Sequence, residues 1–345
     1  MAKKVEMLTN TRLLAEKGDA FAQFMLGRAL LKEARPQALK WLKAAADQGN
    51  EEAAALLKAE FPLAEFASPV AAPVEIAGLP PPDIIDDPLD GGFEESTESL
   101  LASAKGGEAD AMVALGDRYR KGDGDGRSPD YQEAMNWYRK AADLGSALGE
   151  CALGMVYDLG MGVPVNEAEA KAWYLKAARQ GDARAQFNLG NMIRAGRGGA
   201  SNPSVAAKWF QAAADQGDAA AHFALGALYE TGSGVQKDQG QAVEHYRDAA
   251  ENGDADAQFN LANMLRQGIG IEADPSEAAR LYRRAAEQGK AEAAFNYALM
   301  LATGTGVERN EEVAARWLRR AALGGHPPAK RELARLGWKL EESVR

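Results

Sequence analysis

The sequence predicts an all-α fold, an α-solenoid of stacked helix-turn-helix repeats that winds into a right-handed superhelix. Three observations predict it, and all of them recur every 36 residues. A tryptophan ladder starts at Trp137, a leucine ladder at Leu153 and a glycine ladder at Gly145, each over six positions with at most two exceptions. Ladders that stay in phase indicate a repeated supersecondary unit. One helix pair cannot bury its apolar stripe alone, so the units must stack.

The first helix of each unit is defined by a four-residue apolar spacing. In the unit that begins near residue 183, Ala185, Leu189 and Ile193 form one stripe. This spacing is typical of an amphipathic helix. The glycine-rich segment 196–199 is expected to end that helix.

The second helix of the same unit has its own start and stop signals. Pro203 suits the first helical turn, with Asn202 or Ser201 as the cap. Ala206 and Phe210 belong to its apolar stripe. Gly217 follows the helix and is expected to adopt the left-handed conformation.

These units resemble Sel-1-like repeats, which are relatives of the tetratricopeptide repeats. The resemblance rests on the first-helix pattern in residues 221–229, the G-x-G-V loops at 160–163, 232–235 and 304–307, and the second-helix pattern in 172–181. It covers roughly residues 94–337 and implies a non-catalytic scaffold, with roles such as signalling, secretion or envelope assembly. The chain departs from disulfide-stapled secreted members because Cys151 is its only cysteine.

Composition and charge suggest three parts. Residues 1–60 are expected to form an N-terminal four-helix repeat module, residues 61–93 an acidic proline-rich linker, and residues 94–345 a solenoid of six full repeats with capping helices. The ten acidic residues between Glu60 and Glu98 account for the whole net charge of −10. The linker is expected either to dock on the repeats or to act as a flexible tether.

The same composition argues against several functions. Outside the stretch 60–98 the charges balance, with 40 acidic and 40 basic residues, which disfavours a nucleic-acid-binding protein. No stretch has the roughly 18 apolar residues of a membrane span. The first residues lack the apolar segment of a signal peptide, so a cytoplasmic location is expected.

Few residues are suited to catalysis or metal binding. The segment 122–126 does not fit a calcium loop, because Arg127 and Ala134 stand where oxygen ligands are needed. His222, His245 and His326 are assigned to different units and expected to have separate packing or surface roles. We therefore expect no catalytic residues, no metal and no cofactor, and an inert Cys151.

The strongest functional pattern lies on the first helices, which line the concave face in repeat solenoids. Asparagine can hold a peptide backbone, and phenylalanine adds apolar contact area. A structural role for the asparagines is an equal alternative. The candidate partner-binding residues are Arg184, Phe187, Asn188, Asn191, Arg194, Phe223, Phe259, Asn260, Asn263, Arg266, Phe295 and Asn296.

The predicted function is therefore a scaffold or adaptor that binds a partner protein or peptide in a concave groove. We expect a monomer or weak homodimer, with no nucleic acid and no membrane span. The alternatives are an inhibitor or immunity-type protein that occludes a target enzyme, and a chaperone or assembly factor for a secretion or envelope system.

Overall fold

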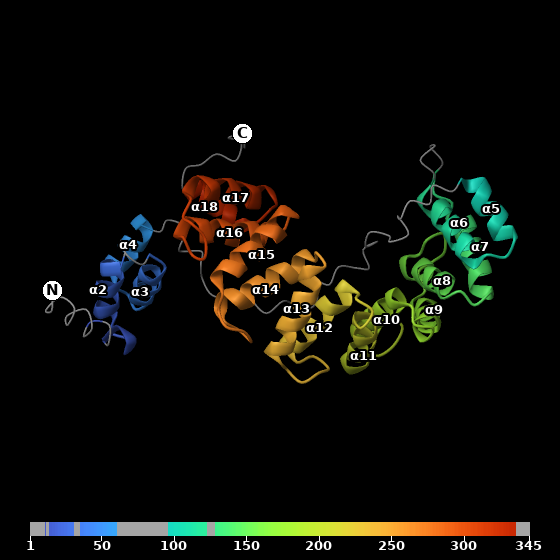
Figure 1. Cartoon of the computed structure of the whole chain (residues 1–345), viewed down its shortest axis with the longest axis horizontal. Coiled ribbons are helices and arrows are strands. Elements are labelled where there is room, and N and C mark those ends of the chain that lie inside the picture. The colour runs from blue at the N-terminus through green and yellow to red at the C-terminus, as the bar shows by residue number, and fades with distance from the viewer. Residues whose placement is uncertain (1–10, 12–13, 31–34, 61–95, 123–127, 336–345) are drawn as a thin grey trace. The chain divides into compact units, whose positions relative to one another are not determined.

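The computed structural model describes residues 11, 14–30, 35–60, 96–122 and 128–335 (Figure 1). The regular structure of these residues is α-helical, without a strand among them. The predicted all-α fold of consecutively packed helices is confirmed. Among the described residues, no helix combines the length and apolar character needed to cross a membrane.

The chain divides into two compact units. One unit spans Val74–Asn252 and contains nine consecutive described helices, each packed against the next. These are α5 (Thr97–Lys105), α6 (Ala109–Lys121), α7 (Tyr131–Asp143), α8 (Ala147–Leu159), α9 (Glu167–Arg179), α10 (Ala183–Ala195), α11 (Pro203–Ala214), α12 (Ala219–Thr231) and α13 (Gln239–Glu251).

The other unit combines Met1–Pro73 with Gly253–Arg345. Its two segments each contain helices that pack in chain order. The described helices are α2 (Ala20–Leu30), α3 (Arg35–Asp47), α4 (Glu51–Glu60), α14 (Ala255–Gln267), α15 (Pro275–Glu287), α16 (Ala291–Thr303), α17 (Glu311–Leu323) and α18 (Pro327–Arg335).

Capping residues set the helix starts. The side chain of Asp182 accepts a hydrogen bond from the backbone N–H of Ala185 at 2.7 Å, at the start of α10. Asn202 accepts from the N–H of Val205 at 3.1 Å and caps α11, with Pro203 in the first turn. Of the two caps considered from the sequence, Asn202 is the one used. Gly217 has φ of 86°, which confirms its predicted left-handed conformation.

Glycine also lets the two helices of a repeat approach closely. A Cβ atom on Gly190 of α10 would lie 2.7 Å from Cε1 of Phe210 on α11. A Cβ on Gly226 of α12 would lie 2.6 Å from Cδ1 of Tyr246 on α13. Both rings are completely buried. In these two repeats a second-helix ring therefore packs directly on first-helix backbone.

Two sequence predictions fall largely outside the described residues. The acidic linker 61–93 lies entirely outside them, and so does most of the calcium-like segment 122–126. The division into module, linker and solenoid stays a prediction.

Candidate functional site

The predicted contact residues of α10 lie at different depths. Phe187 and Asn188 are buried, Arg184 is exposed, and Asn191 and Arg194 are half-buried. A buried side chain cannot meet a partner without local opening of the helix pair. The accessible part of this pattern is therefore the two arginines and Asn191.

The equivalent residues of α14 bond within their own repeat. Phe259 and Asn260 are buried. The hydroxyl of Tyr282, on α15, donates a hydrogen bond to Oδ1 of Asn263 and accepts one from Nε of Arg266 at 3.3 Å. Here Asn263 and Arg266 help to hold the second helix.

The predicted phenylalanine row belongs to the core. Phe187, Phe223, Phe259 and Phe295 are each less than 10% exposed, and the ring centroids of the first three lie 5.7–5.8 Å from a ring of the following helix. Aromatic pairs at this separation stabilise helix contacts. Asn296, next to Phe295, is half-buried.

A pair of amide side chains joins the first helix of a repeat to the residues after its second helix. Nε2 of Gln216 donates to Oε1 of Gln186 at 2.8 Å and to the Gly181 carbonyl at 2.9 Å. Buried Gln186 in turn donates to the Ala178 carbonyl at 3.2 Å. We call the pair Gln186–Gln216 the amide clamp. Equivalent clamps join Gln23 to Gln48 at 2.7 Å, Glu150 to Gln180 at 2.8 Å and Gln258 to Gln288 at 2.9 Å.

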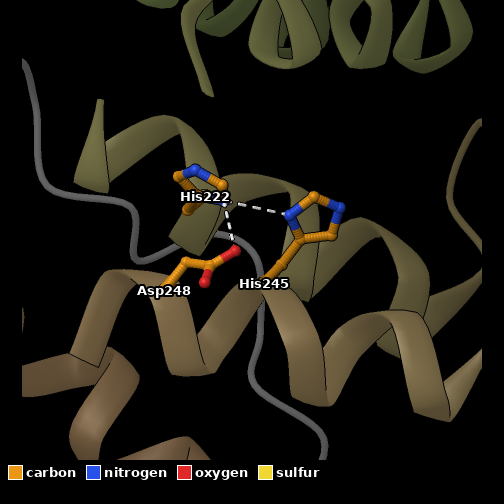
Figure 2. A group of neighbouring side chains, drawn as sticks. All are labelled: His222, His245 and Asp248. Atoms are coloured by element: carbon orange, nitrogen blue, oxygen red, sulfur yellow. Dashed lines mark hydrogen bonds and ion pairs between the residues drawn. The ribbon is translucent and has the colours of Figure 1, made fainter. Parts of the chain in front are cut away.

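The repeat at residues 219–254 replaces the clamp with a different cluster. His222 takes the place of Gln186, 36 residues further along. Its Nδ1 lies 3.1 Å from Nδ1 of His245 and 3.4 Å from Oδ2 of Asp248. Figure 2 shows His222 on one helix, α12, pointing toward His245 and Asp248 on the next, α13. We call these three residues the histidine cluster.

The assignment of the three histidines to different units is wrong for two of them, because His222 and His245 lie in one repeat and touch. They are 23 residues apart, on the two helices of the same hairpin. Their positions in the repeat were visible in the sequence. Their contact depended on how the two helices are rotated about their axes.

The surroundings of His245 keep it neutral. The ring is 9% exposed and stacks on Tyr229 with centroids 5.5 Å apart and an interplanar angle of 10°. Burial, with a smaller effect of His222, lowers the pKa of His245, although Asp248, Glu244 and Asp215 act in the opposite direction. The imidazole of His245 can therefore present a lone pair near neutral pH.

Cys151 is a buried part of α8. Burial raises the pKa of its thiol well above the ordinary value. A thiol without thiolate character is a poor nucleophile. The predicted inert role suits this environment.

Comparison with known proteins identifies the repeat. A model of the Sel1 repeat matches residues 20–50, 109–146, 147–182, 183–218, 219–254, 255–290 and 291–326. The chain belongs to the Sel1 repeat family. Sel1 repeat proteins generally mediate protein–protein interactions and are typically non-catalytic. The comparison with curated proteins gives no match.

Solved Sel1 repeat structures share the fold. The Sel1 repeat protein from Oxalobacter formigenes is 27% identical, with a TM-score of 0.63 over 96% of this chain and 90% of that chain. The protective antigen c5321 of uropathogenic Escherichia coli strains, which displays an SLR fold, is 29% identical, with a TM-score of 0.62 over 95% of this chain and 67% of that chain. The immunity protein Pa5087 from Pseudomonas aeruginosa is 22% identical, with a TM-score of 0.41 over 64% of this chain and 84% of that chain, too distant to bear on function.

Proposed function

We propose that this Sel1 repeat protein is a non-catalytic scaffold that binds a partner protein or peptide along the first helices of its repeats, on a concave face. The observation that carries the proposal is the accessible polar row of α10, formed by Arg184, Asn191 and Arg194. The proposal includes no nucleic-acid partner and no membrane span, and in it the protein acts as a monomer or weak homodimer.

The chemistry of this row suits an extended peptide. An asparagine amide offers a donor and an acceptor for a peptide backbone of any sequence. Arginine adds charge-assisted hydrogen bonds to carboxylates. The phenylalanines and buried asparagines predicted as contacts serve instead to hold the helices that present this row.

Asn191 supports the proposal further by contrast with Asn263. Oδ1 of Asn263 accepts from the hydroxyl of Tyr282, whereas the equivalent second-helix ring near Asn191 is Phe210, which has no hydroxyl. Oδ1 of Asn191 has no hydrogen-bond partner among the described residues. A buried acceptor left in this way is costly. The half-buried Asn191 side chain would have to turn outward for a donor from a partner to reach this oxygen, and that hydrogen bond would relieve the cost.

The test is capture of partners from the native host by the whole chain, quantified by mass spectrometry. The triple variant R184A/N191A/R194A should lose the captured partner. The control K208A/R247A removes two exposed basic residues from second helices and should retain it. Circular dichroism establishes that both variants are folded.

Equal capture by both variants would overturn the proposed face. Recovery of several partners indicates an adaptor. A single tight partner that is an enzyme, and that loses activity in the complex, indicates the inhibitor alternative.

A further inference from the structure

We propose that His222, His245 and Asp248 form a binding site for a divalent first-row transition metal of the zinc class. The site joins α12 to α13 within one repeat (Figure 2). Its residues lie on other helices than the row on α10 proposed to bind a partner.

Two of the three donor-atom distances match a metal centre, and all three donor atoms lie within 4.8 Å of one another. Nδ1 of His222 lies 3.1 Å from Nδ1 of His245 and 3.4 Å from Oδ2 of Asp248. Ligand atoms held tetrahedrally at about 2.0–2.1 Å from zinc lie about 3.3 Å from one another. One ion between the three atoms can therefore reach them with small side-chain adjustments.

The donor types select the metal class. Two imidazole nitrogens and one carboxylate oxygen suit zinc, copper, nickel or cobalt, whereas magnesium and calcium prefer oxygen ligands only. Two further acidic groups, Asp215 and Glu244, act electrostatically on His245, and Asp218 interacts with His222. This negative surrounding favours a cation.

A hydrogen bond alone accounts less well for the geometry. Nδ1 of His222 faces Nδ1 of His245 and the carboxylate of Asp248, and which imidazole nitrogen donates depends on the tautomer. If Nδ1 of His222 carries the proton, that proton is shared between two acceptors, and if Nδ1 of His245 carries it, Asp248 receives no hydrogen bond from a neutral His222. A cation placed between the three atoms accepts a lone pair from each of them.

The three ligand residues occur together in one repeat, and the neighbouring repeats carry other residues at the same three positions. At the corresponding positions the preceding repeat has Gln186, Trp209 and Ala212, and the following repeat has Gln258, Leu281 and Arg284. All three positions of this one repeat therefore carry metal-ligand residue types. His245 and Asp248 are three residues apart, which places them on one face of α13.

The cluster is open to solvent on one side. The side chain of Asp248 is 53% exposed and that of His222 is 15% exposed. A metal ion can enter past Asp248, and water or a donor from a bound protein can supply the fourth ligand. The site therefore has the open position that distinguishes accessible zinc sites from closed structural ones.

The experiment uses the full chain, with any affinity tag removed, after treatment with a chelator. Titration with Zn²⁺ in a calorimeter should give one site per chain, and Co²⁺ should give the visible absorption of a tetrahedral nitrogen–oxygen site. Zn²⁺ should raise the melting temperature, because an ion that binds only the folded state stabilises it.

The decisive variant is H222Q/H245W, which installs residues that the preceding repeat already packs at these positions. It should fold, and its affinity for Zn²⁺ should fall at least about 100-fold, since losing only an outer supporting group costs about 10- to 100-fold. D248N changes an exposed residue and should weaken binding about tenfold or more. H326Q is the matched control and should bind like the unmodified chain.

Two results would overturn the proposal. One is the absence of Zn²⁺ binding by the unmodified chain. The other is binding that H222Q/H245W and D248N leave unchanged. Should H222Q/H245W fail to fold, D248N decides alone, because its exposed side chain can be replaced without repacking the core.

Discussion

The repeats at 183–218 and 219–254 share their first-helix caps and their ring packing but differ in the polar contact between their helices. Both start with a capping aspartate, Asp182 or Asp218, and both pack a buried ring on a first-helix glycine. The first uses the amide clamp where the second has the histidine cluster. The repeat scaffold thus leaves the polar contact between its helices free to vary, because capping and ring packing already determine the helix pair.

The largest expected effect is the transfer of metal binding from one repeat to the other. The variant Q186H/W209H/A212D, built in the H222Q/H245W background, places the three ligands 36 residues earlier. If backbone geometry is shared, this chain should recover binding of Zn²⁺ at one site, measured by calorimetry.

The transfer has a matched control. Q186H/W209H in the same background lacks the carboxylate and should bind at least about tenfold more weakly. A graft that folds but gains no affinity would show that the two repeats differ in side-chain geometry as well as in sequence.

A second comparison concerns the packing that the repeats share. G190V and G226V place branched side chains against Phe210 and Tyr246. Even a single Cβ added to either glycine would lie within 2.7 Å of a ring carbon. Each should lower the free energy of unfolding by about 3 kcal/mol, because overpacking forces ring and backbone shifts. Urea denaturation measures the effect.

The chain itself suggests the control for that packing test. Ala262 and Ala298 occupy the corresponding glycine position in later repeats and are buried. G190A and G226A should therefore cost clearly less than the valine variants. Unequal losses at the two valine sites would contradict a shared helix approach.

The amide clamp predicts a smaller loss. Q186A removes a buried amide and leaves the Ala178 carbonyl without its side-chain donor, at an expected cost of about 1–3 kcal/mol. Q241A is the control, since Gln241 bonds to Glu244 at the surface, and it should change stability by no more than about 0.5 kcal/mol. Thermal denaturation distinguishes them, and equal losses would mean that the clamp is not a stabilising contact.

The smallest effect concerns His326, which packs on the ring of Phe295 with centroids 4.8 Å apart. Burial lowers the pKa of His326 in the folded chain. As the pH is lowered through the ordinary histidine pKa of about 6.5, His326 binds a proton in the unfolded chain before it does so in the folded chain. The free energy of unfolding therefore decreases as the pH is lowered. H326Q should lose less stability than the unmodified chain between pH 7.5 and pH 5.5, measured by urea denaturation. An unchanged pH profile would exclude His326 as a contributor.

The sequence predicted the helices better than the site. The 36-residue ladders located the helix pairs, and local signals limited the cap of α11 to Ser201 or Asn202 and predicted the left-handed Gly217. The residues predicted to contact a partner include both exposed and buried side chains, since Phe187 and Asn188 are buried while Arg184 is exposed. Arg184 is three and four positions from Phe187 and Asn188, so these residues share one face of the helix. The sequence spacing therefore does not separate them, and their burial depends on how the neighbouring helices cover that face.

The repeat, its 36-residue length and the start and stop signals of the helix pair at 183–218 follow from the order of residues alone. These properties depend on local backbone chemistry and on apolar spacing, which a single chain carries in its order of residues. The packing of the helices brings His222, His245 and Asp248 together, which the order of residues did not reveal. It also gives Asn263 a hydrogen bond to Tyr282 that Asn191 lacks. Those contacts join two helices, and their distances depend on the helix separation and rotation that packing against Gly226 and its equivalents imposes.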